Sequence, residues 1–130
     1  MPDSPISIID FHGFNDTTIP ASPDVEGVLG PGPDNTTQTH DGYYYHIKAH
    51  HLARVRAAMN CEEDSAIYPT HMDGEEGWAC EVWTGCDQGA EVVHCTGSFA
   101  SRFPWGGAVD GYQIIWDFMK SHSRGTAMRN

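Results

Sequence analysis

The order of its hydrophobic segments predicts an α/β fold for this chain. A short apolar strand comes first, a helix with an apolar face follows, and two strand-like segments precede a second helix. The chain has 130 residues with a hydrophobic fraction of 39%, which is the size and composition of one folded domain. We therefore expect a single domain over residues 1–130.

The first half of the chain predicts one strand, one loop and one helix. Residues 6–11 form an apolar run with three isoleucines, and Gly13 marks a turn soon after it, so we expect a buried strand. Residues 21–42 are rich in Pro and Gly and show no periodicity, which is typical of a long surface loop. Residues 43–59 contain neither Gly nor Pro and carry apolar side chains at helical spacing, which predicts an amphipathic helix.

The second half predicts two strands and a closing helix. Residues 78–84 and 90–96 are rich in apolar and β-branched residues, and glycines lie between them. Residues 108–122 carry an apolar stripe that places Trp116 in the core, and the polar tail 123–130 is expected to fray. So few strands leave one edge and one face of the sheet uncovered, which indicates part of a larger α/β domain.

The charge of the chain excludes two classes of partner. Seven basic and 18 acidic residues give a formal net charge of −11, whereas nucleic acids and anionic membranes require clustered Lys and Arg. No apolar run approaches the roughly 20 residues that a membrane span needs. The N-terminal residues lack the basic start and apolar stretch of a secretory signal, so we expect a mature chain or a fragment.

The cysteines nevertheless indicate an oxidising compartment. Four of them lie close together in the sequence: Cys61, Cys80, Cys86 and Cys95. An even number so grouped predicts two disulfides, and glycosylation sequons at Asn15 and Asn35 agree with a secreted glycoprotein. Four reduced thiols are the alternative, and a zinc site is disfavoured because no C-x₂-C pair is present.

Several segments together resemble a known family. Residues 8–20, IIDFHGFNDTTIP, resemble the strand–HGxxDxxxP element of secreted α/β-hydrolase esterases, which include feruloyl esterases, acetylxylan esterases and polyhydroxybutyrate depolymerases. Residues 92–97 resemble the last core strand of that family, residues 98–105 the loop after it, and residues 115–118 its closing helix. The resemblance spans residues 6–122 but corresponds to the C-terminal half of the family domain. It implies a partial α/β-hydrolase fold without the nucleophile-bearing half.

The resemblance implies hydrolysis of a carboxylic ester through a Ser-His-Asp acyl-enzyme mechanism. It assigns the triad acid to Asp16, whereas the alternative role of this residue is a turn aspartate that binds its own backbone. No serine of the chain lies in a G-x-S-x-G elbow. Ser101 stands where the family has its catalytic His, and a hydroxyl cannot act as a general base near neutral pH. The chain alone is therefore expected not to turn over esters.

Other histidines were considered as substitutes for the missing base. His94 lies within a predicted strand, several residues before position 101, where the family has its catalytic His. His71 lies in a polar turn region. His12 follows the first strand, and we expect it to orient the Asp16 turn by hydrogen bonds.

The resemblance also implies two disulfide pairs, Cys61–Cys86 and Cys80–Cys95, and makes Trp105 the best candidate for a substrate groove. It implies neither a cofactor nor a metal. The expected partners are an ester substrate, either a plant cell-wall hydroxycinnamoyl or acetyl ester or a polyester, and the missing N-terminal half. The expected location is extracellular.

Two other functions remain open at this point. The first is a catalytically inactive fragment or degenerate paralogue that acts as a binding module. The second is a small His-rich metal-binding domain, because His46 and His50 lie one helical turn apart in the predicted helix.

Overall fold

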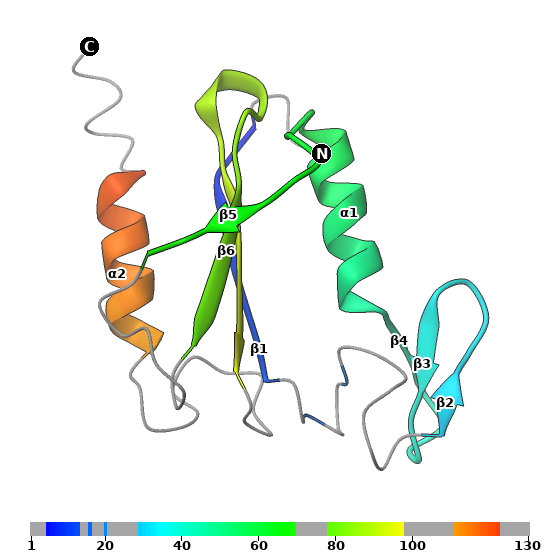
Figure 1. Cartoon of the computed structure of the whole chain (residues 1–130). Coiled ribbons are helices and arrows are strands. Elements are labelled where there is room, and N and C mark those ends of the chain that lie inside the picture. Colours follow the sequence, from blue (N-terminus) through cyan, green and yellow to red (C-terminus); the bar gives the residue numbers. More distant parts are fainter. Residues whose placement is uncertain are drawn as a thin grey trace.

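The protein is a small mixed α/β domain with two helices and two sheets (Figure 1). The computed structural model describes residues 5–13, 16, 20, 29–69, 78–97 and 111–122. A four-stranded mixed sheet stands between the helices, and a three-stranded antiparallel sheet lies beside the start of the first helix (Figure 1). Within these ranges, no helix has the length and apolar character needed to cross a membrane.

The central sheet contains the strands that the sequence predicts and one that it does not. In spatial order its strands are β1 (Ile8–Gly13), β7 (Val92–Gly97), β6 (Ala79–Trp83) and β5 (Ala66–Ile67). β1 is parallel to β7, whereas β6 is antiparallel to both of its neighbours. The three predicted strands are confirmed with small shifts of their ends. β5 was missed because two exposed residues leave no hydrophobic pattern.

One helix packs on each face of this sheet (Figure 1). Helix α1 (Lys48–Ala58) covers one face, where its Leu52 belongs to the same buried cluster as Val92 of β7. Helix α2 (Gly111–Ser121) covers the other face, where Phe118 packs with Val93. Successive residues of β7 therefore point to opposite cores, as the alternation of a strand requires.

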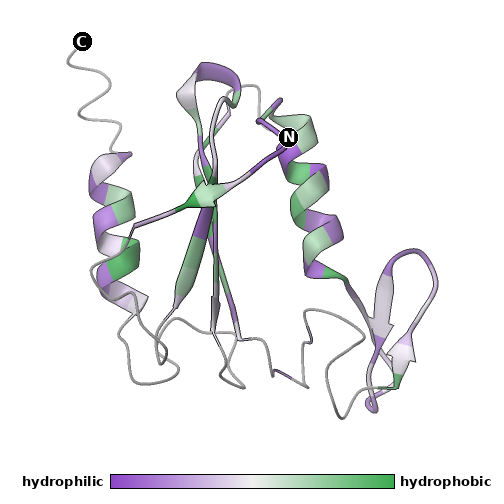
Figure 2. Ribbon diagram, in the orientation of Figure 1, coloured by the Kyte–Doolittle hydropathy of each residue, from purple (hydrophilic) through white to green (hydrophobic). Residues whose placement is uncertain are grey.

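The second sheet corrects the prediction for residues 21–42 and for the start of the helix predicted over 43–59. Its strands are β2 (Gly30–Pro31), β3 (Thr36–Gln38) and β4 (Tyr44–His46), and α1 begins only at Lys48. Asp34 and Asn35 adopt positive φ angles, which close the turn before β3. Two tyrosines and a histidine then pair as a strand, because aromatic residues favour extended backbone. Figure 2 shows this sheet mostly in white and purple, which explains why no apolar alternation marked it. Residues 21–28 and 123–130 lie outside the described ranges.

The buried face of α2 differs from the predicted stripe. Trp116 was expected in the core, yet it is 57% exposed, and Tyr112 and Met119 are exposed beside it. Ile114 and Phe118 face the sheet instead. The helix carries two apolar rows, and periodicity alone cannot choose between them. The row of Ile114 and Phe118, which has no polar side-chain atoms, enters the core, and the row that contains Trp116 and Tyr112 is exposed.

Two disulfides connect the elements around the sheet. Cys61–Cys86 joins the segment after α1 to the loop after β6, and Cys80–Cys95 joins directly facing residues of β6 and β7. The pairing that the resemblance implies is thus confirmed, and the described residues contain no free cysteine. Closing loops of 25 and 15 residues constrains the unfolded chain, which is worth about 3 kcal/mol for each bridge.

Candidate functional site

The carboxyl ends of β1 and β7 meet at one edge of the central sheet. The two strands are parallel and in register from Ile8 opposite Val92 to Gly13 opposite Gly97. Gly13 and Gly97, the last residues of the two strands, therefore lie side by side at this edge. In open α/β sheets, ligands bind outside the carboxyl ends of parallel strands. This edge is the first candidate site.

Asp16, the predicted triad acid, lies just beyond β1 at this edge. Its side chain is 1% exposed, and its backbone N–H donates to the Gly13 carbonyl at 3.3 Å, which forms a tight turn after the strand. The Nε2 atom of the buried His12 lies 3.9 Å from Asp16 Oδ2. That distance exceeds hydrogen-bond range, so His12 acts on this carboxylate through charge when the imidazole is protonated.

The remaining predicted site residues fall into two groups. Asn35 occupies an exposed turn, and its Nδ2 lies 3.4 Å from His50 Nε2. Four others lie outside the described residues: Asn15, His71, Ser101 and Trp105.

A second group of ionisable residues lies on the α1 face of the sheet. Asp10 of β1 is opposite His94 of β7, and Asp10 Oδ2 lies 2.8 Å from His94 Nδ1. The ammonium of Lys48, at the start of α1, donates to Asp10 Oδ1 at 3.0 Å. The Asp10 carboxylate therefore binds one group on the neighbouring strand and another on the covering helix.

The environment of Asp10 favours its charged form. Burial alone would raise the pKa of Asp10, but the hydrogen bond to His94 and the positive charge of Lys48 outweigh it. The pKa of Asp10 therefore lies below its ordinary value. Sequence reasoning missed this trio because it depends on strand register. The available signal was that Asp10 and His94 interrupt the apolar runs of two strands predicted to share a sheet.

A pocket of about 200 Å³ lies next to His94. It is lined by residues of β6 and β7: Ala79, Cys80, Glu81, His94 and Thr96. Glu81 is opposite His94 in the sheet, and it accepts a hydrogen bond of 2.9 Å from Ser65 Oγ. The pocket therefore brings an imidazole and a carboxylate to one hollow on the α1 face.

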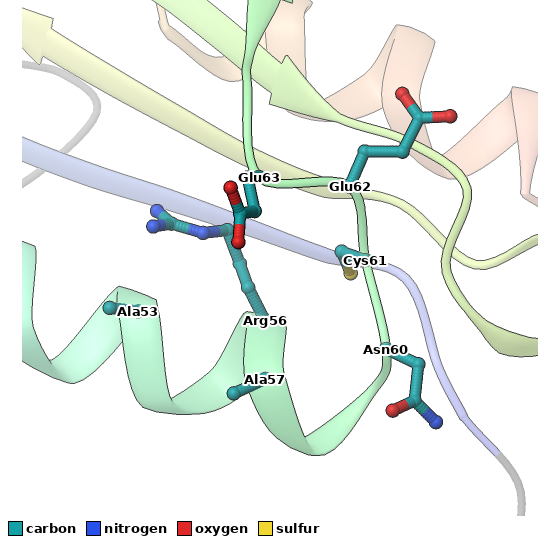
Figure 3. Close-up of a pocket in the computed structure, with 7 residues that line it drawn as sticks. All are labelled: Ala53, Arg56, Ala57, Asn60, Cys61, Glu62 and Glu63. Carbon is teal, nitrogen blue, oxygen red and sulfur yellow. The ribbon is translucent and has the colours of Figure 1, made fainter.

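A larger hollow of about 430 Å³ lies at the end of α1 (Figure 3). The guanidinium of Arg56 lies 4.1 Å from the centre of the Trp83 ring. Figure 3 shows Glu63 on the Arg56 side of this hollow, whereas Glu62 points away from Arg56. One guanidinium and two carboxylates line it with small residues and an amide.

The histidines near α1 do not form the pair that the sequence predicts. His46 lies in β4 rather than on the helix, and its ring stacks on His51 at 6.4 Å between centroids. His50 lies beside Asn35 instead. The helical spacing that motivated a metal site is therefore absent. In the described part of the chain, no group of three or more His, Cys, Asp or Glu residues could hold a metal ion.

Comparison of the chain with models of protein families, with curated proteins and with solved structures found no match.

Proposed function

We propose that this chain forms the C-terminal portion of a secreted carboxylic ester hydrolase of the feruloyl esterase and polyhydroxybutyrate depolymerase type. The observation that carries the proposal is the shared edge of β1 and β7. Asp16 follows β1 and is buried there, and residues 98–105, which resemble the histidine loop of the family, follow β7. In α/β-hydrolases the triad appears in the order Ser, Asp, His, so the acid and the base come from loops placed in this way.

In this proposal, Asp16 holds the catalytic imidazole. A serine supplied from outside this chain attacks the ester carbonyl while the imidazole accepts its proton. Asp16 accepts the Nδ1–H bond of that imidazole, fixes its tautomer and stabilises the imidazolium that forms. The near-complete burial of Asp16 strengthens this interaction because little water competes for the carboxylate. A histidine at position 101 would supply the base of the triad.

The substrate proposed is an uncharged ester, either a hydroxycinnamoyl or acetyl ester of plant cell walls or a polyester. A net charge of −11 repels anionic substrates but tolerates neutral ones. Trp105 is proposed to line the groove. The two disulfides support an oxidising compartment, and the exposed Asn35 is proposed to carry a glycan.

The experiment uses the assembled protein. This protein contains the present chain together with either the sequence encoded in frame upstream of Met1 or a second chain that co-purifies with it. We expect a G-x-S-x-G elbow in that additional sequence. With Ser101→His, we expect hydrolysis of methyl ferulate or p-nitrophenyl butyrate that falls about 10³- to 10⁴-fold in Asp16→Asn. Absence of a serine elbow from both sources would overturn the proposal, as would a gain in activity with Ser101→His that is the same with and without the Asp16 carboxylate.

A non-catalytic binding module is the second candidate. It is supported by Ser101 at the position of the family histidine and by the exposed apolar row of α2, which contains Tyr112, Trp116 and Met119. If the assembled protein carries a serine elbow but Ser101→His produces no turnover, this second candidate is favoured.

A further inference from the structure

The contact between Asp10 and His94 determines which nitrogen of the imidazole carries the proton. An ionised carboxylate only accepts hydrogen bonds, and Asp10 Oδ2 lies 2.8 Å from His94 Nδ1. The neutral imidazole must therefore carry its hydrogen on Nδ1, and its basic lone pair lies on Nε2. Lys48 binds the other oxygen of Asp10 at 3.0 Å, which holds the carboxylate in place.

His94 lines the pocket over β6 and β7. The residue is 8% exposed, and its Nδ1 is engaged by Asp10. Among the described residues, no hydrogen bond or ion pair engages Nε2. The basic nitrogen thus has limited contact with bulk water and no bond within the described structure that would prevent it from accepting a proton.

In contrast to the expectation from the incomplete triad that the chain alone is inactive, we propose that Asp10 and His94 form a proton-transfer site, separate from the Asp16 edge. In this site His94 Nε2 is the general base that activates water against small uncharged esters. The size of the pocket, about 200 Å³, is below the roughly 300–1,000 Å³ of cavities that hold drug-sized ligands. Glu81 lies opposite His94 in the same pocket, so an anionic ester is repelled.

The reaction requires no oxidant or further reactant. His94 Nε2 removes a proton from water as the water oxygen bonds to the ester carbonyl carbon, and the carbonyl π electrons move to its oxygen. When the tetrahedral species collapses, the bond to the alcohol oxygen breaks and the imidazolium returns its proton to that oxygen. Asp10 stabilises the transient imidazolium, as the carboxylate of a catalytic triad does.

The charged groups around the site come from β1, β6 and α1. Asp10 of β1 and Glu81 of β6 lie on either side of His94, and Lys48 of α1 binds Asp10. His12 lies two residues after Asp10 in β1, on the same face of the sheet. The mechanism uses the neutral form of the His94 imidazole, because only that form has a free lone pair to accept the proton of water.

The test measures hydrolysis of p-nitrophenyl acetate by the purified 130-residue chain. General-base catalysis typically contributes 10²–10⁴-fold, so we expect the rate above background to fall about 100-fold in His94→Gln. Asp10→Asn should lower kcat about 10-fold or more with KM little changed. His122→Gln is the matched control, because His122 Nε2 also lies 3.0 Å from a carboxylate, that of Glu91, away from the pocket. Equal rates in wild type and His94→Gln, or an equal loss in His122→Gln, would overturn the proposal.

Two further measurements distinguish the site from a purely structural ion pair. Glu81→Gln should raise the rate on the anionic ester 4-acetoxybenzoate by a larger factor than the rate on p-nitrophenyl acetate. In long-range ¹H–¹⁵N NMR spectra of the wild-type chain, the neutral His94 imidazole should show a protonated Nδ1 and an unprotonated Nε2. A neutral His94 protonated on Nε2 would contradict the mechanism even if the variants fail to fold.

Discussion

Replacing Asp10 with Ala removes the carboxylate that joins β1, β7 and α1. Asp10 accepts one hydrogen bond from His94 and one from Lys48, at 2.8 and 3.0 Å. Its side chain is only 25% exposed, so both bonds form largely away from water. The variant retains the strand but leaves a partly buried ammonium and an imidazole without their shared acceptor.

The cost can be estimated from these two contacts. Hydrogen bonds that involve charged groups contribute about 1.5–3 kcal/mol each, and the desolvation of Asp10 offsets part of that gain. The Lys48 side chain is 22% exposed and retains some access to water, so the loss does not reach the full sum. We expect Asp10→Ala to lower the free energy of unfolding by about 2–4 kcal/mol at pH 7.

The dependence on pH has a definite sign. The pKa of Asp10 is lowered in the folded state, so its contribution is present above the unfolded value of about 3.9 and is lost as the pH falls through the folded value. The difference between wild type and Asp10→Ala should therefore decrease from pH 5 towards pH 2. Urea unfolding followed by tryptophan fluorescence at a series of pH values measures it.

The matched control for this prediction is Asp117→Ala. Asp117 is 42% exposed and lies 3.7 Å from Lys120, so its loss should cost no more than about 1 kcal/mol. Equal losses in the two variants would refute the argument that burial and shared bonding make Asp10 important. A difference that grows in acid would refute the sign of the pKa shift.

Two further predictions concern α2 and the turn after β6. Ile114→Ala and Phe118→Ala should each lower the free energy of unfolding by about 2–5 kcal/mol, whereas Trp116→Ala should lower it by less than about 1 kcal/mol. Urea midpoints that rank the variants in the opposite order would contradict the observed buried face of the helix. Gly85→Ala should lower the melting temperature more than Gly89→Ala. Both glycines have positive φ, but only at Gly85 would the new Cβ meet another residue, at 2.7 Å from Glu62 Cγ. Equal shifts in melting temperature would show that this contact is relieved easily.

Periodicity predicted the strands and helices that carry strong patterns. Leu52 of α1 and Met59, which follows the helix directly, are both buried as their spacing predicts. The two apolar segments predicted as strands correspond to β6 and β7. The small sheet was missed because the strand Thr36–Gln38 has no alternation of apolar residues. Its backbone pairs only because positive φ angles at Asp34 and Asn35 turn the chain, and a hydrophobicity pattern does not record that.

The two candidate sites differ in how far the sequence could define them. Asp16 was found from a local motif, and the structure places it buried beyond β1. The Asp10–His94 contact joins residues 84 positions apart, so it follows only from the parallel pairing of β1 with β7. The choice of Trp116 as a core residue failed for a similar reason, because the partner surface decides which row of a doubly apolar helix is buried.

The measurement that tests the proposed esterase most directly is a double-mutant cycle on methyl ferulate hydrolysis. It compares the protein assembled with its serine elbow, as wild type, Ser101→His, Asp16→Asn and the double variant. Because acid and base act as a unit, we predict a large gain in kcat with Ser101→His that disappears in the double variant, and little effect of Asp16→Asn in the wild-type background. Gains that are equal with and without the Asp16 carboxylate would contradict the assignment of Asp16 as the triad acid.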